Sequence, residues 1–505
     1  MAGFVFLVAC NHASPVQDTS VDGAANGSNG SDGDVATDAG SGDGPLASID
    51  PFAVQPDTSA GLTNTSADLN AVLENGTLAG ACDRYWKDAA NADRKSLLLC
   101  GKQMYFYETF GTQGVPKSFP KFLIDNFPDD VGAGFAKFGM VADPSSTDHF
   151  PLGLAPSAKF AGSLDAVAFT CASCHFAKLS DGRYSVGAPN HGYEYGKSIL
   201  AMAIFPTAAL SGTSGHDPDA VVVVQPHIDK ANSNIVLKAA LIGTLLPLIT
   251  SGGMMPNFPA TAEHHYAQWK SGTMDFLMEP LPVNDNVHVV SKISALWGLP
   301  TDDEIKSSGM VNAMIGLSGN GPSLLGFAQK FISVGGGDLA AWPDEKLQPL
   351  LEYVYSLRAP QNPSPPVATL VAQGKQLFAD KGCTSCHDGP RGSGKRVYTF
   401  EEIGSDDALK YWLDPDLTGT PCCGFSLSNG DKLTHGVKSP RLVGQWALSR
   451  FLHNGSVGSL EDLFCVGGAR GKVTDQAFGD RGHNLTCDGL SSDEKTALIA
   501  FLKSI

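Results

Sequence analysis

The stretch Cys171-Ala172-Ser173-Cys174-His175 decides how this chain is interpreted, and it recurs as Cys383-Thr384-Ser385-Cys386-His387. Cys-x-x-Cys-His is the attachment signature of a c-type haem. Residues three and four apart share one face of a helical turn, so both thiols can bond to the porphyrin edge while the imidazole reaches the iron. A zinc site is the alternative, but structural zinc needs paired ligand sets, and each stretch here has a single His. We therefore expect two covalently bound haem c groups, attached through Cys171, Cys174, Cys383 and Cys386, with His175 and His387 as iron ligands.

The composition is that of an ordinary globular protein, with 42% apolar and 17% charged residues in a chain of 505. The net charge of −17 leaves no basic stripe to bind phosphates, so we expect no nucleic-acid binding. Six of the eleven cysteines remain once the four in the repeated stretches and Cys10 are set aside. Covalent haem and spare paired cysteines both indicate an oxidising compartment. Cys82 and Cys100 predict a local bridge, whereas the sequence leaves open the pairing of Cys422, Cys423, Cys465 and Cys487.

The N-terminal residues favour attachment to a membrane. Residues 1–10 form an apolar run ending Leu7-Val8-Ala9-Cys10, which resembles the lipobox of bacterial lipoproteins, although the usual basic region is missing. Residues 11–60 contain no Lys or Arg and much Asp, Gly and Ser, so they predict a disordered acidic tether. A later apolar run, 235–249, contains Lys238 and predicts a buried helix rather than a membrane span. We expect a periplasmic or cell-surface lipoprotein, held by its lipid in the outer membrane of a Gram-negative bacterium.

A proline-rich stretch, residues 359–366, is the clearest internal boundary. It separates an N-terminal haem domain, residues 61–358, from a C-terminal cytochrome c domain, residues 367–505. Residues 367–382 predict the first helix of the second domain, and Ser491 with Glu494 predicts a capping box at the start of its last helix. We expect these two helices to pack together. The predicted fold class is mainly α, with two cytochrome c-like haem domains, long irregular loops and an enlarged N-terminal domain.

Further stretches resemble a known family. They are Gly374-Lys375-Gln376-Leu377-Phe378, the run from Phe451-Leu452-His453-Asn454-Gly455 to Leu463, Ser294-Ala295-Leu296-Trp297-Gly298-Leu299-Pro300, and Gly482-His483. With the two haem motifs, they resemble the bacterial di-haem cytochrome c peroxidase/MauG superfamily, and the last two stretches look closer to its rubber-oxygenase-like branch. The resemblance covers roughly residues 90–505. It implies two mainly helical haem domains, with electrons passing between the irons and chemistry at one of them.

The second haem lacks a methionine ligand within its own domain, because none of the ten Met residues lies beyond position 314. Its candidate distal ligands are therefore His435, His453 and His483. The resemblance implies that His483 is the iron ligand. It also implies that His453, inside His-Asn-Gly, binds a propionate or lines the haem edge.

The sequence allows several alternatives for the distal ligand of the first haem. His191 follows His175 at a spacing similar to that of the second His on the peroxidatic haem of di-haem peroxidases, which makes it a candidate ligand and catalytic residue. Residues 187–190 also look like the oxygenase-like branch, where this side is open to a ligand, and Met202, Met254 and Met255 are further candidates. Trp297, the second catalytic candidate, could lie between the haems or line the distal pocket.

Two functions follow from these assignments. In the first, the protein is a peroxidase- or oxygenase-type oxidoreductase in which haem 2 passes electrons to a haem 1 that activates peroxide or dioxygen. The N-terminal domain is larger than one haem requires, and apolar stretches around 235–300 predict a pocket there. In the second, the protein is a pure electron-transfer cytochrome with no catalytic site. Either function implies a small redox protein or a quinol-linked donor or acceptor as partner.

Overall fold

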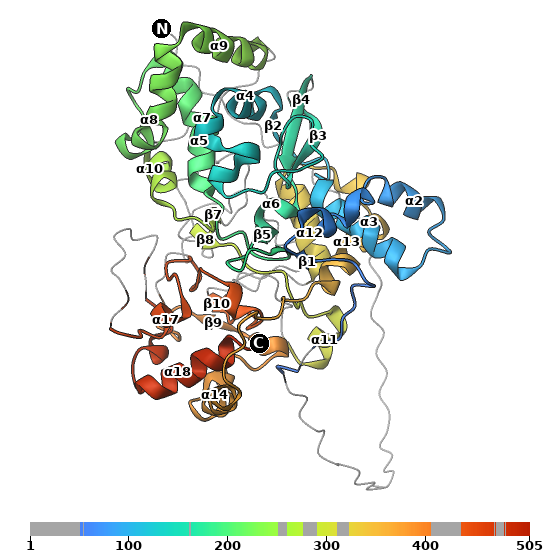
Figure 1. Cartoon of the computed structure of the whole chain (residues 1–505), viewed down its shortest axis with the longest axis vertical. Coiled ribbons are helices and arrows are strands. Elements are labelled where there is room, and N and C mark those ends of the chain that lie inside the picture. The colour runs from blue at the N-terminus through green and yellow to red at the C-terminus, as the bar shows by residue number, and fades with distance from the viewer. Residues whose placement is uncertain are drawn as a thin grey trace, which may run out of the picture. The chain divides into compact units, whose positions relative to one another are not determined.

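The helices and strands are those of a computed structural model that describes residues 51–505, except 54, 161–162, 251–259, 276–289, 311–322, 406–435, 469, 471–478 and 480. These residues form mainly helices with a few small sheets, so the mainly-α expectation is confirmed at that level (Figure 1). The chain from Asp50 onward is one compact unit. Several sequence predictions lie outside the described residues, namely those on residues 1–10 and most of 11–60 and on Met254, Met255, Cys422, Cys423 and His435.

The helices are α1 (Leu69–Val72), α2 (Ala81–Lys87), α3 (Arg94–Tyr107), α4 (Ser118–Asn126), α5 (Pro128–Val131), α6 (Cys171–His175), α7 (Tyr195–Ser211), α8 (Pro218–Ser233), α9 (Ile235–Thr250), α10 (Ala260–Gln268), α11 (Asp302–Ser307), α12 (Leu324–Val334), α13 (Asp344–Ser356), α14 (Ala368–Asp380), α17 (Leu460–Leu463) and α18 (Ser492–Leu502). Short 3₁₀ turns include η2 (Ala133–Phe138), η4 (Cys383–Ser385), η5 (Pro390–Gly392) and η9 (Asn484–Thr486). The strands are β1 (Thr65–Ser66), β2 (Val115–Pro116), β3 (Leu154–Phe160), β4 (Leu164–Phe169), β5 (Phe176–Lys178), β6 (Tyr184–Val186), β7 (Thr273–Asp275), β8 (Val290–Lys292), β9 (Val397–Thr399) and β10 (Gly436–Lys438).

Two small antiparallel sheets flank the first Cys-x-x-Cys-His stretch. Strand β4 of the sheet β2-β4-β3 ends at Phe169, and strand β5 of the sheet β1-β6-β5 begins at Phe176. Helix α6 fills the interval between these two strands. One apolar core includes Ala172 on one side of α6, and a second core packs against Cys174 on the other. The first motif is therefore held where two cores meet.

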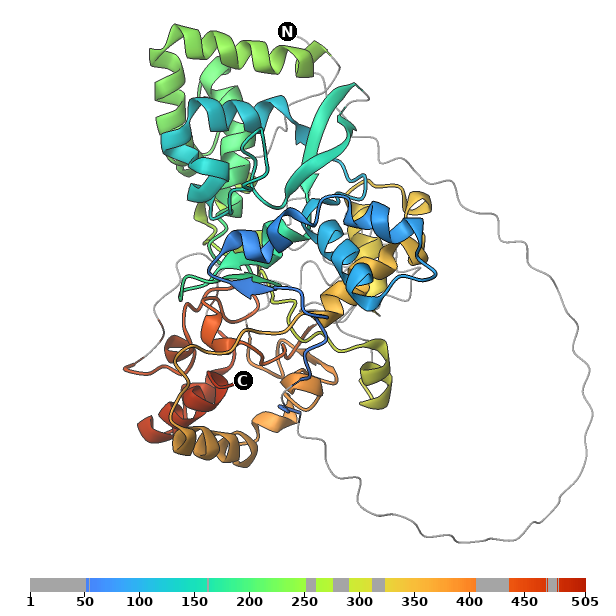
Figure 2. The same ribbon diagram turned by 45° about the vertical axis from the view of Figure 1, so that its right-hand side comes forward.

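The first and last helices of the C-terminal part, α14 and α18, lie side by side as expected (Figures 1 and 2). Gly374 permits the close approach, since a Cβ added there would lie 2.0 Å from the carbonyl oxygen of Ala497. The predicted capping box of Ser491 and Glu494 is also confirmed. Phe52 packs edge-on against the rings of Phe378 and Phe501, with ring centres 5.6 and 5.3 Å away. Phe52 thus packs in the core of the C-terminal part, although it lies within the tether that the sequence predicts for residues 11–60.

Helix α9 departs from the buried helix that the sequence predicts. Its inner face is a row of buried Leu side chains at positions 237, 241 and 245. Ile235 and Val236 on its outer side are 84% and 75% exposed, and Ile242 and Leu246 are about half exposed. The apolar run therefore covers the core with one face only. Among the described helices, none has the length and apolar character needed to span a membrane.

The disulfides resolve part of the cysteine pattern. The predicted Cys82–Cys100 bridge is confirmed. A second bridge joins Cys465 to Cys487, which settles half of the pairing that the sequence leaves open. The four cysteines of the repeated motifs form no disulfide.

Candidate cofactor sites

The first candidate site is built on the short helix α6. Thr170 caps this helix by accepting a hydrogen bond from the N–H of Ala172. The thiols of Cys171 and Cys174 are buried, which raises the pKa of each to about 12. The Nδ1 atom of His175 lies 2.9 Å from the carbonyl oxygen of Ser294. Because a carbonyl only accepts, Nδ1 carries the hydrogen and Nε2 keeps its lone pair for a metal. Burial lowers the pKa of His175 to about 4, so the ring is neutral at neutral pH.

The second candidate site repeats this arrangement on different local structure. Cys383 lies in η4, and the His387 N–H donates to its carbonyl oxygen over 3.0 Å. The Nδ1 atom of His387 lies 2.6 Å from the carbonyl oxygen of Gly392, so its Nε2 also keeps a lone pair. Burial lowers the pKa of His387 as well. Each motif thus presents two unpaired thiols and one neutral imidazole that is held at Nδ1 by a main-chain carbonyl.

His483 lies opposite His387, with ring centres 6.4 Å apart and ring planes 63° apart. A His nitrogen binds a metal at about 2.0 Å, and the ring centre lies about 1.2 Å behind that nitrogen. Two His rings on opposite sides of one metal ion are therefore separated by about 6.4 Å, centre to centre. The Nδ1 atom of His483 lies 3.5 Å from Oγ1 of Thr486. Burial, and then the nearby His387, lowers the pKa of His483 to about 4. His387 and His483 could together hold a metal ion between them.

His453, the other described candidate for the second site, has different surroundings. Its Nδ1 atom lies 3.4 Å from the hydroxyl of Ser405, and its ring centre lies 6.4 Å from that of Phe400. Its main-chain carbonyl accepts the N–H of Lys292 over 2.9 Å. Asn454, the next residue, is fully buried and donates from its amide to the carbonyl oxygen of Gly479. The contacts of the His453 side chain, with Ser405 and Phe400, are therefore different from those of His483.

His191 is placed as a bridge between loops. The N–H of Ser449 donates to its Nδ1 over 3.1 Å, so Nδ1 is unprotonated and Nε2 carries the hydrogen. That Nε2 lies 3.1 Å from the carbonyl oxygen of Ile293, to which it donates. Burial lowers the pKa of His191 to about 3, which keeps this neutral tautomer. Both ring nitrogens are therefore engaged, and His191 as placed has none left for an iron ion.

Trp297 is fully buried between the two motif regions. Its indole N–H donates over 2.8 Å to the carbonyl oxygen of Val186, which lies in β6, the second strand after the first motif. A Cβ added to Gly187 or to Gly444 would lie within 3.0 Å of the indole ring. Gly187 follows β6, and Gly444 lies in the C-terminal part. Trp297 is thus enclosed by both parts of the chain, and its catalytic role stays a prediction.

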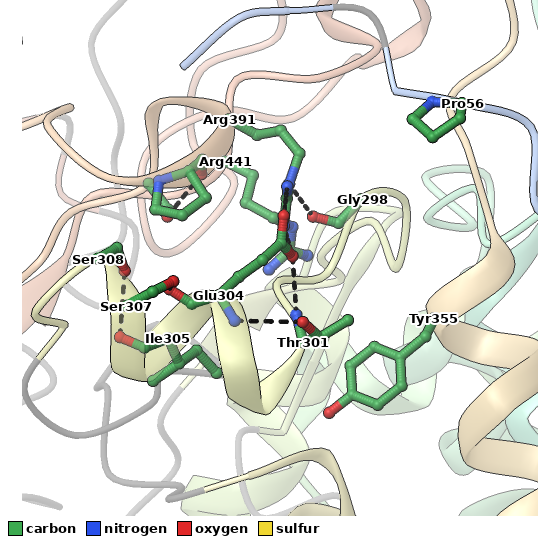
Figure 3. Close-up of polar contacts among 12 residues, drawn as sticks. Pro56, Gly298, Thr301, Glu304, Ile305, Ser307, Ser308, Tyr355, Arg391 and Arg441 are labelled. Carbon is green, nitrogen blue, oxygen red and sulfur yellow. Dashed lines mark hydrogen bonds and ion pairs between the residues drawn. The ribbon is translucent and has the colours of Figure 1, made fainter. Parts of the chain in front are cut away.

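Residues 292–298, which we call the connecting segment, touch both candidate sites through main-chain carbonyls. Ser294 accepts from His175, and Ile293 accepts from His191. Arg441 donates to Ala295 and Trp297 over 2.5 and 3.1 Å. Gly298 accepts from Nε of Arg391 over 2.7 Å (Figure 3). The sequence indicates none of these contacts, because every residue type offers the same carbonyl. For Arg391, the only indication in the sequence is a weak one, namely its position shortly after the second motif.

An apolar cavity lies near the first site. It is lined by residues from the β2-β4-β3 sheet, η2 and α7, including Phe138, Met140, Phe169, Tyr193 and Met202. Tyr193 is close enough to Cys174 for that thiol to contribute, after burial, to raising the pKa of the phenol. The sequence predicts a pocket around 235–300, whereas this cavity is lined by residues between 114 and 202. Met202, one of the predicted alternatives as a ligand, does line it.

A separate group of possible ligands lies away from both motifs. Atoms of Asp217, Asp219 and His264 lie within 4.8 Å of one another, and it is the one such cluster of three or more His, Cys, Asp or Glu side chains among the described residues. Asp219 and His264 are exposed, as is common for acidic groups without an ion.

Comparisons with known proteins give no family assignment. No protein-family model matches the chain, and no curated protein matches it. Among solved structures, the chain is similar to hydrazine synthase from Kuenenia stuttgartiensis pressurised with xenon. The two are 18% identical over 48% of this chain and 79% of the other, with a TM-score of 0.26.

Proposed function

We propose that this chain is a di-haem c-type cytochrome that acts as an oxidoreductase. Cys171 and Cys174 would hold the first haem, with His175 as iron ligand. Cys383 and Cys386 would hold the second, with His387 and His483 as its two iron ligands. The observation that carries the proposal is the pair His387 and His483, whose ring centres are 6.4 Å apart beside two thiols outside any disulfide. The matching carbonyl on Nδ1 of His175 and His387 adds to it, since metal-bound His residues usually donate from their other nitrogen.

The geometry of the thiols favours haem over zinc. A structural zinc ion needs four donor atoms that converge on one point. Among the described residues, the Cys-Cys-His sets of the two motifs do not form such a converging group, since the one cluster found is Asp217, Asp219 and His264. A c-type haem has no such requirement, because its two thiols bond to the porphyrin edge while the imidazole reaches the iron.

The two sites differ in a way that suggests different roles. At the second, His387 and His483 would both hold the iron, which suits electron transfer without ligand binding. At the first, both nitrogens of His191 are hydrogen-bonded elsewhere, and an apolar cavity lies near Cys174. Haem 1, when bound there, would supply an iron able to activate peroxide or dioxygen. The apolar lining would exclude water, while Tyr193 and Ser198 bring hydroxyl groups to the cavity wall.

A second candidate function, electron transfer alone, is favoured by one observation. The side chains of Met140 and Met202 line the same cavity, and a thioether from either could close the first iron. For either function, the electron partner would be a small redox protein or a quinol-linked donor. The disulfides Cys82–Cys100 and Cys465–Cys487 support a location in the oxidising periplasm or at the cell surface.

Haem content tests the proposal directly. We expect the purified chain to carry two thioether-bound haems, measured by a haemochrome assay and by intact mass. The double variants Cys171→Ser/Cys174→Ser and Cys383→Ser/Cys386→Ser should each lose one. As the control, Cys82→Ser/Cys100→Ser removes a cysteine pair from outside the motifs and should keep both haems. A wild-type chain without covalent haem, or with zinc in its place, would contradict the proposal.

Ligand binding separates the two candidate functions. Cyanide and peroxide are added to the oxidised and half-reduced protein, and the spectrum of haem 1 is followed. Binding in either state supports the oxidoreductase with a reactive first centre. If neither state binds, Met140→Ala and Met202→Ala are tested in turn. Binding that appears only in one of these variants identifies a methionine ligand and a protein that only transfers electrons.

A further inference from the structure

Arg391 makes a tightly arranged set of contacts beside the second site (Figure 3). Its two terminal nitrogens donate to the two carboxylate oxygens of Glu304 over 2.7 and 2.8 Å. Its Nε donates to the carbonyl oxygen of Gly298 over 2.7 Å. The guanidinium side chain is only 7% exposed. All three directions of the fork are thus used, which fixes the position of the guanidinium group.

The backbone of Arg391 leads directly to the imidazole of His387. Gly392, the next residue, supplies the carbonyl that accepts from Nδ1 of His387 over 2.6 Å. Arg391 itself has φ of 56°, in the left-handed region that side chains other than Gly rarely adopt. Such a conformation persists when its surroundings over-determine it. The contacts to Glu304 and Gly298 add to the main-chain hydrogen bonds that hold this turn, from the Arg391 N–H to Pro51 and from the Leu442 N–H to Arg391. Together these contacts fix where the carbonyl of Gly392 points.

Glu304 is held as firmly as the arginine that it binds. It occupies the third position of α11, where it completes a capping box with Thr301 and accepts the N–H of that residue over 2.9 Å. Burial alone would raise the pKa of Glu304, but the hydrogen bonds from Arg391 and Thr301 outweigh it and lower the pKa. The carboxylate is therefore charged at neutral pH and oriented by its own helix. Helix α11 begins shortly after the connecting segment. Glu304 is therefore close in the chain to Ser294, whose carbonyl oxygen accepts from His175.

We propose that Arg391 and Glu304 are positioning residues that set the hydrogen bond on His387 and thereby lower the reduction potential of haem 2. The inference rests on the proposed function. A strong, well-aligned acceptor on Nδ1 makes the imidazole a better electron donor to the metal, and this favours the oxidised iron. If the fork is lost, the carbonyl of Gly392 can turn away, the bond to His387 weakens, and the potential rises.

Conservative variants of the holoprotein separate positioning from charge. Arg391→Lys and Glu304→Asp keep both charges but lose the two-pronged fit. We expect each to raise the equilibrium ratio of reduced to oxidised haem 2 by about three- to tenfold at a fixed potential, a tenfold change being about 59 mV for a one-electron couple. Glu304→Gln should raise the ratio of reduced to oxidised haem 2 as well, because this substitution removes the negative charge of the carboxylate and weakens its hydrogen bonds to Arg391. Potentiometry with optical detection gives the ratio, and EPR g-values of the low-spin iron report the altered imidazole.

The ion pair Lys503–Glu461, at 2.6 Å and partly exposed in the same C-terminal part, provides the matched control. Lys503→Arg and Glu461→Asp should leave the ratio unchanged. A shift in Glu304→Gln alone would mean a simple charge effect and would overturn the inference. So would lower unfolding stability of Arg391→Lys and Glu304→Asp with an unchanged potential and EPR spectrum. Should Arg391→Lys fail to fold, Glu304→Asp decides, since that side chain is 40% exposed. A wild-type chain without haem at Cys383 and Cys386 would refute the proposed function instead.

Discussion

The second haem of the His483→Ala variant is expected to change completely from low spin to high spin. In the proposed site His483 is the second imidazole, with its ring centre 6.4 Å from that of His387, so its removal would leave the iron with one strong ligand fewer. No Met residue in the C-terminal part can replace it, because the last Met of the chain is Met314. The haem should stay attached, since Cys383 and Cys386 are untouched. Optical and EPR spectra of the oxidised protein measure the change, which should affect half of the total haem.

His453→Ala is the matched control for this result. His453 is a buried His in the same C-terminal part, but its Nδ1 atom faces the hydroxyl of Ser405. The variant should keep the low-spin spectrum and shift only the reduction potential. If His453→Ala gives the high-spin haem and His483→Ala does not, the two assignments must be exchanged. If both variants stay low spin, the ligand is neither of them, and His435→Ala becomes the variant to examine.

The Gly374→Ala variant is expected to destabilise the C-terminal part severely. A Cβ at position 374 would lie 2.0 Å from the carbonyl oxygen of Ala497 and 2.8 Å from Cβ of Phe501. The closest clash is with backbone, so relief requires α14 and α18 to move apart and the apolar contact between Phe378 and Phe501 to loosen. Overpacking of a core costs about 1–3 kcal/mol and occasionally more. We expect a loss of about 3 kcal/mol in the free energy of unfolding, measured by denaturant titration.

Gly243→Ala gives the control for this substitution. Gly243 lies inside helix α9, and a Cβ added there would meet no atom within 4 Å. The helix preference of Ala over Gly should then leave the protein unchanged or about 1 kcal/mol more stable. The inference that α14 and α18 pack through Gly374 fails if the two variants unfold at the same denaturant concentration.

The local features of this chain could be predicted from its sequence, because each depends on residues near one another in the chain. Ser491 and Glu494 form their capping box within one helical turn. Cys82 and Cys100 pair across two successive helices. The two Cys-x-x-Cys-His stretches also keep their thiols out of any disulfide. The expected pairing of the first and last C-terminal helices is longer in range, and it followed from the likeness of residues 367–505 to a cytochrome c module, whose first and last helices pack together.

The partners of the key imidazoles were decided only by the tertiary structure. Ser294 and Gly392 hold His175 and His387 through main-chain carbonyls, which every residue possesses and no sequence pattern marks. His191 has the spacing of a ligand, yet the fold engages both of its nitrogens with main-chain groups far away in the chain. Periodicity also could not show that α9 leaves Ile235 exposed, because an apolar run marks which residues are apolar and not how many of its faces the fold covers. The sequence by itself determined which side chains can do the chemistry, whereas the tertiary structure decided which of their atoms are free, because hydrogen-bond partners distant in the chain meet only in the folded protein.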